Sequence, residues 1–265
     1  GSGAAFRIRG ERGPVDVMRP MTAEARAARD PIGAAMFPMV PFANRIGDNR
    51  LSFRGETYRF AANNPPERFH VHGTGWHSVW EEERLDPSES ILSLTRAVGG
   101  EPYAYRAEQH FTLSPEGLAV TMTVENRGAA AMPFGFGEHP WFIRDDDVEL
   151  RFSAAAFWLE GPDHVATERI GIPPELSFQS WTPLPRARRN NCYSGWHGVA
   201  EIRWPSRGIG LEIVADPVFG HLMLYCDPAR PFFCLEPQSH ATSAFDRLGE
   251  SEGAELGVIV LAPGE

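Results

Sequence analysis

The sequence predicts an all-β protein, and three observations lead to that class. Apolar and polar residues alternate with a period of two in short segments such as 117–126 and 210–214, which is the pattern of a strand with one buried face. The 26 glycines and 23 prolines supply the turns that many short strands require. Helical periodicity is scarce, and the one helix that we expect lies in 22–29, with Thr22 as its N-cap.

Further strands are expected along the whole chain. The alternating segments are 50–60, 117–126, 200–204, 210–214 and 257–261. The proline-rich segment 160–189 is weakly patterned, and we expect a long surface excursion there. Because no linker, charge block or internal repeat divides the sequence, residues 1–265 are predicted to form a single domain.

Composition excludes several classes of function. The net charge of −10 repels phosphate backbones and anionic bilayers, so neither nucleic acid nor a membrane is an expected partner. No apolar run in the sequence is long enough to span a bilayer. All 25 cationic residues are arginine, which excludes a Schiff-base lysine and a P-loop lysine.

The cysteines indicate the cellular compartment. Cys192, Cys226 and Cys234 are few, odd in number and not in CxxC spacing, so we predict neither a disulfide framework nor a structural zinc site. The sequence also begins without the pattern of a secretory signal peptide. We therefore expect a cytoplasmic protein, and we predict a monomer or a homodimer.

Three ionisable residues stand out by their position. Glu236 and His139 each precede a proline, His72 precedes a glycine, and all three end an apolar stretch. Such positions are typical of the exit of a strand, from which a side chain reaches a cleft. A carboxylate accepts a proton and an imidazolium donates one near neutral pH, so the set predicts proton transfer on a neutral, hydroxyl-rich substrate.

Each of these residues also has a structural interpretation. Glu236 would form a salt bridge with an arginine, and His139 would be a hydrogen-bonded histidine of the core. His70 and His72 would share one face of a strand and bind a metal, as in cupin-type barrels, but the carboxylate that such a site needs three or four residues later is missing. We therefore expect no metal, a functional His72 and a structural His70.

Two further motifs favour the binding of a polar small molecule. Arg45, preceded by Asn44 in a mostly apolar segment, offers five donors suited to hydroxyls or a carboxylate. Its structural alternative is an ion pair that orders the loop, with Glu236 as one possible partner. Trp141 is expected at the site because sugars stack their apolar face on aromatic rings. The glycines of 73–75 and 135–137 open no helix, so neither segment is predicted to bind phosphate.

In their order along the chain, these motifs resemble the aldose 1-epimerase (galactose mutarotase) family. The likeness covers nearly the whole sequence. Residues 41–47 and 53–58 are similar to the family's Asn-Arg-Ile segment and the Gly-x-x-Tyr strand after it, His72–Gly73 to its His-Gly motif, 139–142 to its His-Pro-Tyr/Trp-Phe motif, and 236–238 to its Glu-Pro-x segment.

The resemblance implies a β-supersandwich of antiparallel sheets with an open sugar cleft and neither metal nor cofactor. It implies that Glu236 is the base on the anomeric hydroxyl, that His139 is the acid on the ring oxygen, and that His72 is a third catalytic group that polarises the sugar. The substrate-binding residues that it implies are Asn44, Arg45, Trp141, Asn190 and Gln238.

One position departs from the family's pattern. Asn190 stands where family members usually carry an Asp that holds sugar hydroxyls, so a negative charge is lost. The leading hypothesis is a mutarotase for a free or modified aldose. The alternatives are a mutarotase for an anionic sugar (a hexose 6-phosphate, a sulfonated or a uronic sugar) held by Arg186, Arg188 and Arg189, a non-catalytic sugar-binding protein on the same scaffold, and a cupin-like metal protein.

Overall fold

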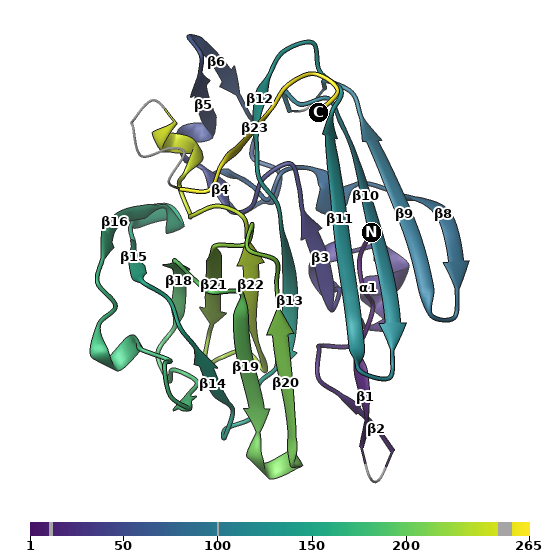
Figure 1. Cartoon of the computed structure of the whole chain (residues 1–265), viewed down its shortest axis with the longest axis vertical. Coiled ribbons are helices and arrows are strands. Elements are labelled where there is room, and N and C mark those ends of the chain that lie inside the picture. The colour runs from purple at the N-terminus through teal and green to yellow at the C-terminus, as the bar shows by residue number, and fades with distance from the viewer. Residues whose placement is uncertain (11–12, 100, 249–255) are drawn as a thin grey trace. The chain divides into compact units, whose positions relative to one another are not determined.

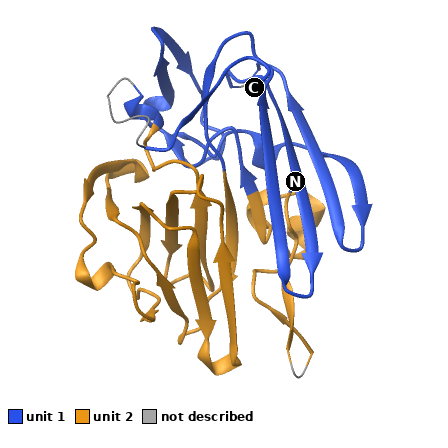
Figure 2. Ribbon diagram, in the orientation of Figure 1, with its two compact units in different colours: residues 1, 38–136, 245–265 blue, residues 2–37, 137–244 orange. Residues whose placement is uncertain are grey.

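The computed structural model describes residues 1–10, 13–99, 101–248 and 256–265 (Figure 1). Most described elements are strands in antiparallel sheets, and only one is an α-helix, which confirms the predicted all-β class. Contacts between Cα atoms divide the chain into unit 1, residues 1, 38–136 and 245–265, and unit 2, residues 2–37 and 137–244 (Figure 2). The single domain over 1–265 stays a prediction.

Unit 1 is built on a four-stranded sheet in the order β11-β10-β9-β8. Its strands are β8 (Glu81–Asp86), β9 (Glu89–Arg96), β10 (Tyr105–Ser114) and β11 (Gly117–Asn126). β10 and β11 pair along their whole length, so the strand predicted for 117–126 is confirmed. Three two-stranded sheets complete the unit: β4 (Arg45–Ile46) with β7 (His70–Val71), β5 (Arg50–Phe53) with β6 (Glu56–Arg59), and β12 (Met132–Phe134) with β23 (Ile259–Leu261).

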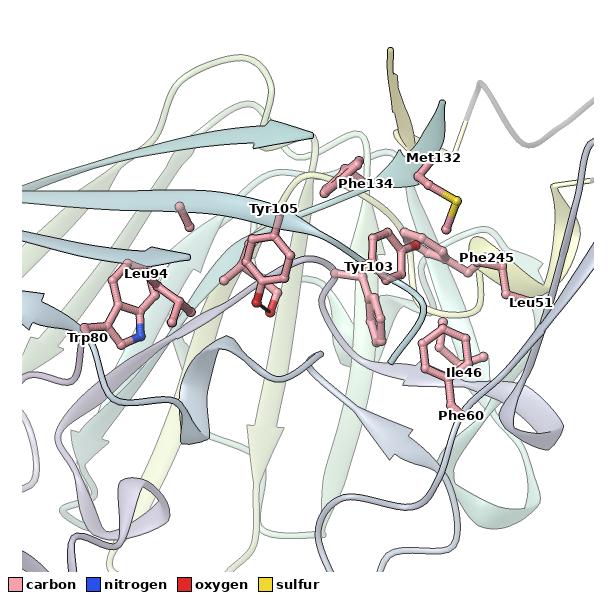
Figure 3. Close-up of a cluster of buried hydrophobic side chains, with 13 residues drawn as sticks. Ile46, Leu51, Phe60, Trp80, Leu94, Tyr103, Tyr105, Met132, Phe134 and Phe245 are labelled. Carbon is pink, nitrogen blue, oxygen red and sulfur yellow. Dashed lines mark hydrogen bonds between the residues drawn. The ribbon is translucent and has the colours of Figure 1, made fainter. Parts of the chain in front are cut away.

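The core of unit 1 is rich in aromatic residues. Figure 3 shows Tyr103, Phe60 and Phe245 grouped together, and Phe42 lies 5.4–6.1 Å from all three ring centroids. Rings in offset or edge-to-face contact at such distances stabilise a core beyond the area that they bury. Each tyrosine hydroxyl in this core finds an acceptor, as Tyr103 donates to the Pro133 carbonyl at 2.6 Å and Tyr105 to the Val40 carbonyl at 3.5 Å.

Unit 2 holds a seven-stranded sheet in the order β16-β15-β18-β21-β22-β13-β3, of which only the last two residues of β3 belong to unit 1. The strands are β3 (Met36–Met39), β13 (Gly137–Ile143), β15 (Ala156–Glu160), β16 (Ala166–Ile170), β18 (Arg189–Ser194), β21 (His221–Cys226) and β22 (Phe232–Gln238). A second sheet has the order β17-β14-β19-β20, with β14 (Glu149–Phe152), β17 (Thr182–Pro183), β19 (Val199–Trp204) and β20 (Ile209–Val214). β1 (Arg7–Gly10) and β2 (Gly13–Asp16) form a hairpin.

The two faces of the seven-stranded sheet differ in chemistry. Because side chains alternate along a strand, Phe233 and Leu235 of β22 point to one face and Cys234 and Glu236 to the other. The apolar face packs on the second sheet, since the ring of Tyr193 lies 5.0 Å from that of Phe152 on β14. Both faces of β22 are buried, which explains why 232–235 form a continuous apolar run rather than an alternating one.

The expected helix is present as α1 (Ala23–Ala28). The Thr22 side chain accepts a hydrogen bond from the Ala25 N–H at 3.1 Å, as an N-cap does. The remaining helical turns are short 3₁₀ segments: Pro31–Gly33, Gly47–Asn49, Gly75–His77, Pro162–His164, Pro174–Leu176, Pro205–Arg207 and Phe245–Arg247. In the described part of the chain, no helix combines the length and the apolar character that a membrane crossing needs.

The surface excursion predicted for 160–189 is wrong in part. β16 pairs with β15 at the edge of the seven-stranded sheet, and β17 pairs with β14 in the second sheet. Phe178 is buried, and its ring stacks on that of Phe152 at 4.9 Å. Strands of two to five residues separated by prolines are too short for an alternating pattern to be recognised in the sequence.

Candidate active site

The polar face of the seven-stranded sheet gathers most of the residues that were predicted to carry chemistry. The β13–β22 register pairs Gly137 with Gln238 and Trp141 with Cys234, which places His139 opposite Glu236 on the same face. The His139 Nε2 atom lies 3.2 Å from Oε1 of Glu236. Both side chains are buried, with 8% and 3% of their residues' surfaces exposed.

The prediction that Glu236 and His139 lie at strand exits is wrong. Both lie inside their strands, because β22 continues to Gln238 and β13 to Ile143. Pro237 and Pro140 therefore do not end the strands that contain them. Both prolines lie between two paired positions of the ladder, Gly137↔Gln238 and Trp141↔Cys234. A proline has no N–H to donate to that ladder.

Glu236 has a partner at each carboxylate oxygen. Oε1 faces His139, and Oε2 accepts a hydrogen bond from the Gln238 side-chain amide at 3.0 Å. A buried carboxylate without such partners would be costly, so both contacts stabilise it where it lies. His139 is thus one partner of this buried carboxylate, and the structural alternative of a salt bridge to an arginine stays a prediction.

The His139 ring is held in a stack of aromatic rings. Its centroid lies 4.5 Å from that of Phe37 and 5.0 Å from that of Trp141, with small interplanar angles in both cases. The Arg19 guanidinium lies 4.3 Å from the Trp141 ring centroid. The stack fixes the plane of the imidazole and keeps Nε2 directed at Glu236.

Among the described residues, the indole Nε1 of Trp141 and the Oε1 atom of Gln238 on this face have no hydrogen-bond partner. The orientation of the Gln238 amide follows from chemistry, since only its NH₂ group can donate to the carboxylate of Glu236. One donor and one acceptor thus flank the His139–Glu236 pair, and both are groups that bind hydroxyls.

Asn190 lies further along the same face. β18, β21 and β22 pair Asn190 with Tyr225 and Tyr225 with Cys234, so these side chains form one row with Trp141. The Asn190 amide donates to Oε1 of Glu160 at 2.7 Å. A carboxylate is therefore present next to the position where the family's Asp is replaced by Asn.

Glu160 is also bound by two cationic or polar groups. Arg188 Nη1 donates to Oε2 at 3.0 Å, and His164 Nδ1 lies 2.5 Å from Oε1. Burial disfavours ionisation of Glu160, but the hydrogen bonds from Asn190, Arg188 and His164 outweigh that effect and lower the pKa of the carboxyl below its usual value. Glu160 is thus an anion that already neutralises Arg188.

Ser194 and His221 lie in the row of Gln238 on the same face, and their hydrogen bonds are those of core residues. The Trp158 indole donates to the Ser194 hydroxyl at 2.7 Å, and the same hydroxyl shares a hydrogen bond of 2.9 Å with Nδ1 of His221. Burial lowers the pKa of His221 to about 3 and that of His240 to about 4, so both imidazoles are neutral in the folded protein.

The remaining predicted residues belong to unit 1. β7 ends at Val71, and His72 follows it with a φ of 60°, so the predicted strand exit is confirmed at this position. The Asn44 N–H donates to Nδ1 of His72 at 3.0 Å, and the His72 N–H donates to the Asn44 carbonyl at 2.9 Å. Because Nδ1 accepts this hydrogen bond, a neutral His72 carries its ring proton on Nε2.

Arg45 is bound by an acid of its own unit. Its guanidinium makes two hydrogen bonds to the Glu67 carboxylate, both at 3.0 Å. The loop-ordering ion pair, predicted as the structural alternative, therefore exists, with Glu67 as the partner. The role of Arg45 in substrate binding stays a prediction.

His70 has the contacts of a core residue, as expected. It is buried, its Nδ1 lies 2.7 Å from the Ala61 carbonyl oxygen, and its Nε2 lies 3.5 Å from Oε2 of Glu101. Thr74 donates a short hydrogen bond to the same carboxylate.

Sequence reasoning missed Cys234 and Glu160. Cys234 lies two positions before Glu236 and shares its face, a spacing that could have been noticed once 232–238 was predicted to be a strand. Burial, and next the negative charge of Glu236, raise the pKa of its thiol well above the usual value. Glu160 lies 30 positions before Asn190, and no local pattern links the two.

Comparisons with known proteins agree with this architecture. Residues 6–265 match the sequence profile of the family described as Aldose 1-epimerase. The chain is 37% identical to the uncharacterized protein YphB of Escherichia coli (strain K12) over 240 residues, which are 88% of this chain and 80% of that one. A crystal structure of a putative aldose 1-epimerase from E. coli K12 has a TM-score of 0.87 at 33% identity and covers 95% of this chain and 85% of its own.

A more distant structure shows the fold alone. The GalM/aldose epimerase homologue from C. elegans has a TM-score of 0.82 at 17% identity, over 100% of this chain and 89% of that one. The galactose mutarotase-like fold that the motifs implied is thereby confirmed. With a family match that begins at residue 6 and runs to residue 265, the chain belongs to the aldose 1-epimerase family.

Proposed function

We propose that the protein is a mutarotase that interconverts the α and β anomers of an aldose by opening and reclosing the sugar ring. One observation carries the proposal: the buried carboxylate of Glu236 and the Nε2 atom of His139 lie 3.2 Å apart on one polar sheet face. The anomeric hydroxyl and the ring oxygen of a pyranose are bonded to the same carbon. A base and an acid that are adjacent can therefore act on both oxygens at once.

The proton transfers balance over one turnover. Glu236 takes the proton of the anomeric hydroxyl, the C1–O5 bond breaks with its electron pair on O5, and protonated His139 donates a proton to O5. The product is the open-chain aldehyde. After rotation about C1–C2, neutral His139 takes the proton back from the O5 hydroxyl as O5 attacks C1, and protonated Glu236 returns a proton to O1. Each positioned transfer contributes about 10²–10⁴-fold to the rate.

Gln238 and Trp141 are proposed to orient the sugar. The Oε1 acceptor of Gln238 and the Nε1–H donor of Trp141 have no protein partner among the described residues, and sugar hydroxyls are both donors and acceptors. Binding would satisfy these groups, whose isolation in the buried face is otherwise unfavourable. Since the Trp141 ring is already in contact with His139 and Arg19, an edge-on hydrogen bond is better supported than the stacking expected from the sequence.

His72, Asn44 and Arg45 are proposed to contact the substrate on the strength of family membership. Within unit 1, His72 is held by Asn44 with Nδ1 as the acceptor, which suits Nε2 for donation to a sugar oxygen. Arg45 is fixed by Glu67 with its guanidinium plane defined by two hydrogen bonds. A guanidinium held in this way retains N–H groups for a hydroxyl.

A neutral aldose is the better supported substrate. The anionic alternative needs cationic groups near Asn190, but Arg188 is already paired with Glu160. Arg189 donates to the Arg188 carbonyl at 3.4 Å. An anionic substituent placed next to Asn190 would meet the ionised Glu160 as well as Arg188, so the two charges offset each other.

The test is anomer exchange measured by magnetisation-transfer NMR over a panel of neutral, phosphorylated and uronic aldoses. We expect accelerated exchange for at least one neutral aldose, with a rate proportional to protein concentration. Binding of a sugar without any acceleration would refute the catalytic proposal and favour the sugar-binding alternative. Acceleration confined to anionic sugars would refute the proposed neutral substrate while keeping the mechanism.

A further inference from the structure

Next to the proposed acid and base lies a thiol that the reaction does not use. Cys234, His139 and Glu236 each offer one donor atom, and these three atoms all lie within 4.8 Å of one another. In the described part of the chain, this is the one group of histidine, cysteine and acidic side chains with such spacing. All three side chains are buried.

The grouping follows from strand geometry. Cys234 and Glu236 are separated by two positions on β22 and so project from the same face. The β13–β22 register brings His139 to that face from the neighbouring strand, beside the Trp141↔Cys234 pair. The ligands thus come from two paired strands that each have a neighbour on both sides in a seven-stranded sheet, which is a rigid support for a coordination site.

The donor set suits Zn²⁺. Sulfur, imidazole nitrogen and carboxylate oxygen are its three protein ligand types, with bonds of about 2.0–2.3 Å, and three protein ligands plus water form a common tetrahedral site. Such bonds place the ligand atoms roughly 3.3–3.8 Å apart, so side-chain shifts on the order of 1 Å would close the present group around an ion. A thiolate and a carboxylate together neutralise the two charges of the ion.

We propose that Cys234, His139 and Glu236 form a binding site for Zn²⁺ or another thiophilic divalent cation. Binding forms a metal–sulfur bond as the thiol proton leaves to solvent. It also forms a bond to His139 Nε2, whose proton leaves to solvent while Nδ1 keeps the ring proton, and a bond to an oxygen of ionised Glu236. Metal binding at this site does not depend on the proposed mutarotase function. The effect of the metal on activity rests on that function.

The consequence is inhibition. A cation bound by these residues takes the lone pair of Glu236 that would accept the anomeric proton and the Nε2 atom of His139 that would donate to the ring oxygen. Zinc would therefore be an inhibitor, and removal of trace zinc would activate preparations that contain it. Sugar and metal would compete, because both require the same two side chains.

The direct test is metal binding to the purified full-length chain, kept reduced with a phosphine. Co²⁺ is the spectroscopic probe, because a thiolate ligand gives an intense near-ultraviolet charge-transfer band and a tetrahedral site gives visible bands. We expect one such site per chain, displaced by Zn²⁺. Cys234→Ser should abolish the charge-transfer band and weaken Zn²⁺ binding by about tenfold or more, measured by competition with a chromophoric chelator.

Cys226→Ser is the matched control. Cys226 is also a buried free thiol on the same sheet, but β21 turns it to the opposite face, and its Sγ lies near the carbonyls of Pro185 and Ala187. Its metal binding should equal that of the wild type. Equal Zn²⁺ affinity in Cys234→Ser and wild type, or a wild-type Co²⁺ spectrum without a thiolate band, would overturn the proposal. The wild-type spectrum tests it even if Cys234→Ser does not fold.

Activity then separates this proposal from the proposed function. Anomer exchange is measured with increasing Zn²⁺, and each variant is compared with its own metal-free rate. Zinc should inhibit the wild type and Cys226→Ser at concentrations about tenfold or more below those that inhibit Cys234→Ser. If zinc fills the site that Co²⁺ reports and the rate of anomer exchange does not change, the inhibitory role is overturned. If the protein binds zinc but accelerates anomer exchange of no sugar, the proposed metal site stands and the proposed mutarotase function is refuted.

Discussion

The side-chain amide of Gln238 donates to Oε2 of Glu236 at 3.0 Å, across two positions of the same strand. This bond restrains the carboxylate and leaves Oε1 as the oxygen that faces His139, 3.2 Å away. The base and the acid of the proposed reaction are therefore oriented by one strand pair before any sugar binds. Such preorganisation reduces the cost of reaching the reactive geometry.

Replacement of Glu236 by Gln should reduce anomer exchange by about 10²–10⁴-fold, because the amide keeps the shape of the side chain but cannot accept the anomeric proton. Sugar binding, measured by calorimetry, should persist. Glu201→Gln is the control, since Glu201 pairs with Arg151 on the second sheet of unit 2. Exchange at the wild-type rate in Glu236→Gln would assign the base to another group.

Replacement of His139 by Asn should remove the alkaline limb of the pH–rate profile. An imidazolium donates only while it is protonated, so the wild-type rate should fall at high pH as the acid loses its proton. The variant has no such proton to lose, and most of its rate should be lost at every pH. His110→Asn, which changes a partly exposed histidine paired with Glu89, should keep the wild-type profile. An unchanged alkaline limb in His139→Asn would show that another residue is the acid.

Glu160 should control the response to charged sugars. Glu160→Gln keeps a hydrogen-bonding group beside Asn190 but releases Arg188 from its ion pair. The ratio of specificity constants for an anionic aldose over its neutral analogue should rise about tenfold at low salt, and less at high salt because screening weakens the attraction. Glu149→Gln, which breaks the pair with Arg203 on the second sheet, is the control. A ratio that stays at the wild-type value would place Arg188 outside the substrate's reach.

Metal removal should not lower activity. The proposed transfers use only Glu236 and His139, so dialysis against a chelator should leave the exchange rate unchanged, or raise it where zinc had been bound. The rate is measured before and after dialysis and again after each divalent ion is added back. Activity that is lost on dialysis and restored by one ion would refute the proton-transfer mechanism and revive the metal-protein alternative.

Acid should destabilise the fold through His221 and His240. Burial holds their pKa values at about 3 and about 4, below the ordinary value of about 6.5 that they regain on unfolding. Below that value the unfolded chain binds protons that the folded chain does not, so their stabilising contribution is complete above about pH 6.5 and declines as the pH falls toward 4 and 3. Each histidine contributes a slope of up to about 1.4 kcal/mol per pH unit.

Urea unfolding at several pH values checks this expectation. His221→Gln should be less stable than the wild type at neutral pH, because Ser194 loses its hydrogen-bond partner Nδ1. Its unfolding free energy should nevertheless fall less steeply as the pH is lowered. The difference in slope should approach about 1.4 kcal/mol per pH unit, the contribution of one bound proton. An identical slope in the variant and the wild type would show that the pKa of His221 is the same in the folded and the unfolded chain.

The sequence by itself determined the all-β class, the capped helix after Thr22 and the identity of Glu236 and His139 as candidates. Periodicity and turn residues are local signals, so they can be recognised in the sequence without knowledge of the fold. The order of the motifs was enough to identify the family, because that order does not depend on how the strands are arranged. The same local signals misplaced both residues at strand exits, since Pro140 and Pro237 usually mark ends and here lie within β13 and β22.

Only the tertiary structure decided which residues meet. The pairing of β13 with β22 brings His139 to Glu236 across 97 positions of sequence, and the pairing of β15 with β18 brings Glu160 to Asn190. A one-residue change in either register would turn one side chain of each pair to the opposite face. The register of a strand pair is set by which face of each strand is buried against the second sheet. The contacts between His139 and Glu236 and between Glu160 and Asn190 are a consequence of that register. The acid–base pair, the neutralised Arg188 and the thiol beside Glu236 therefore follow from packing, which no local sequence pattern encodes.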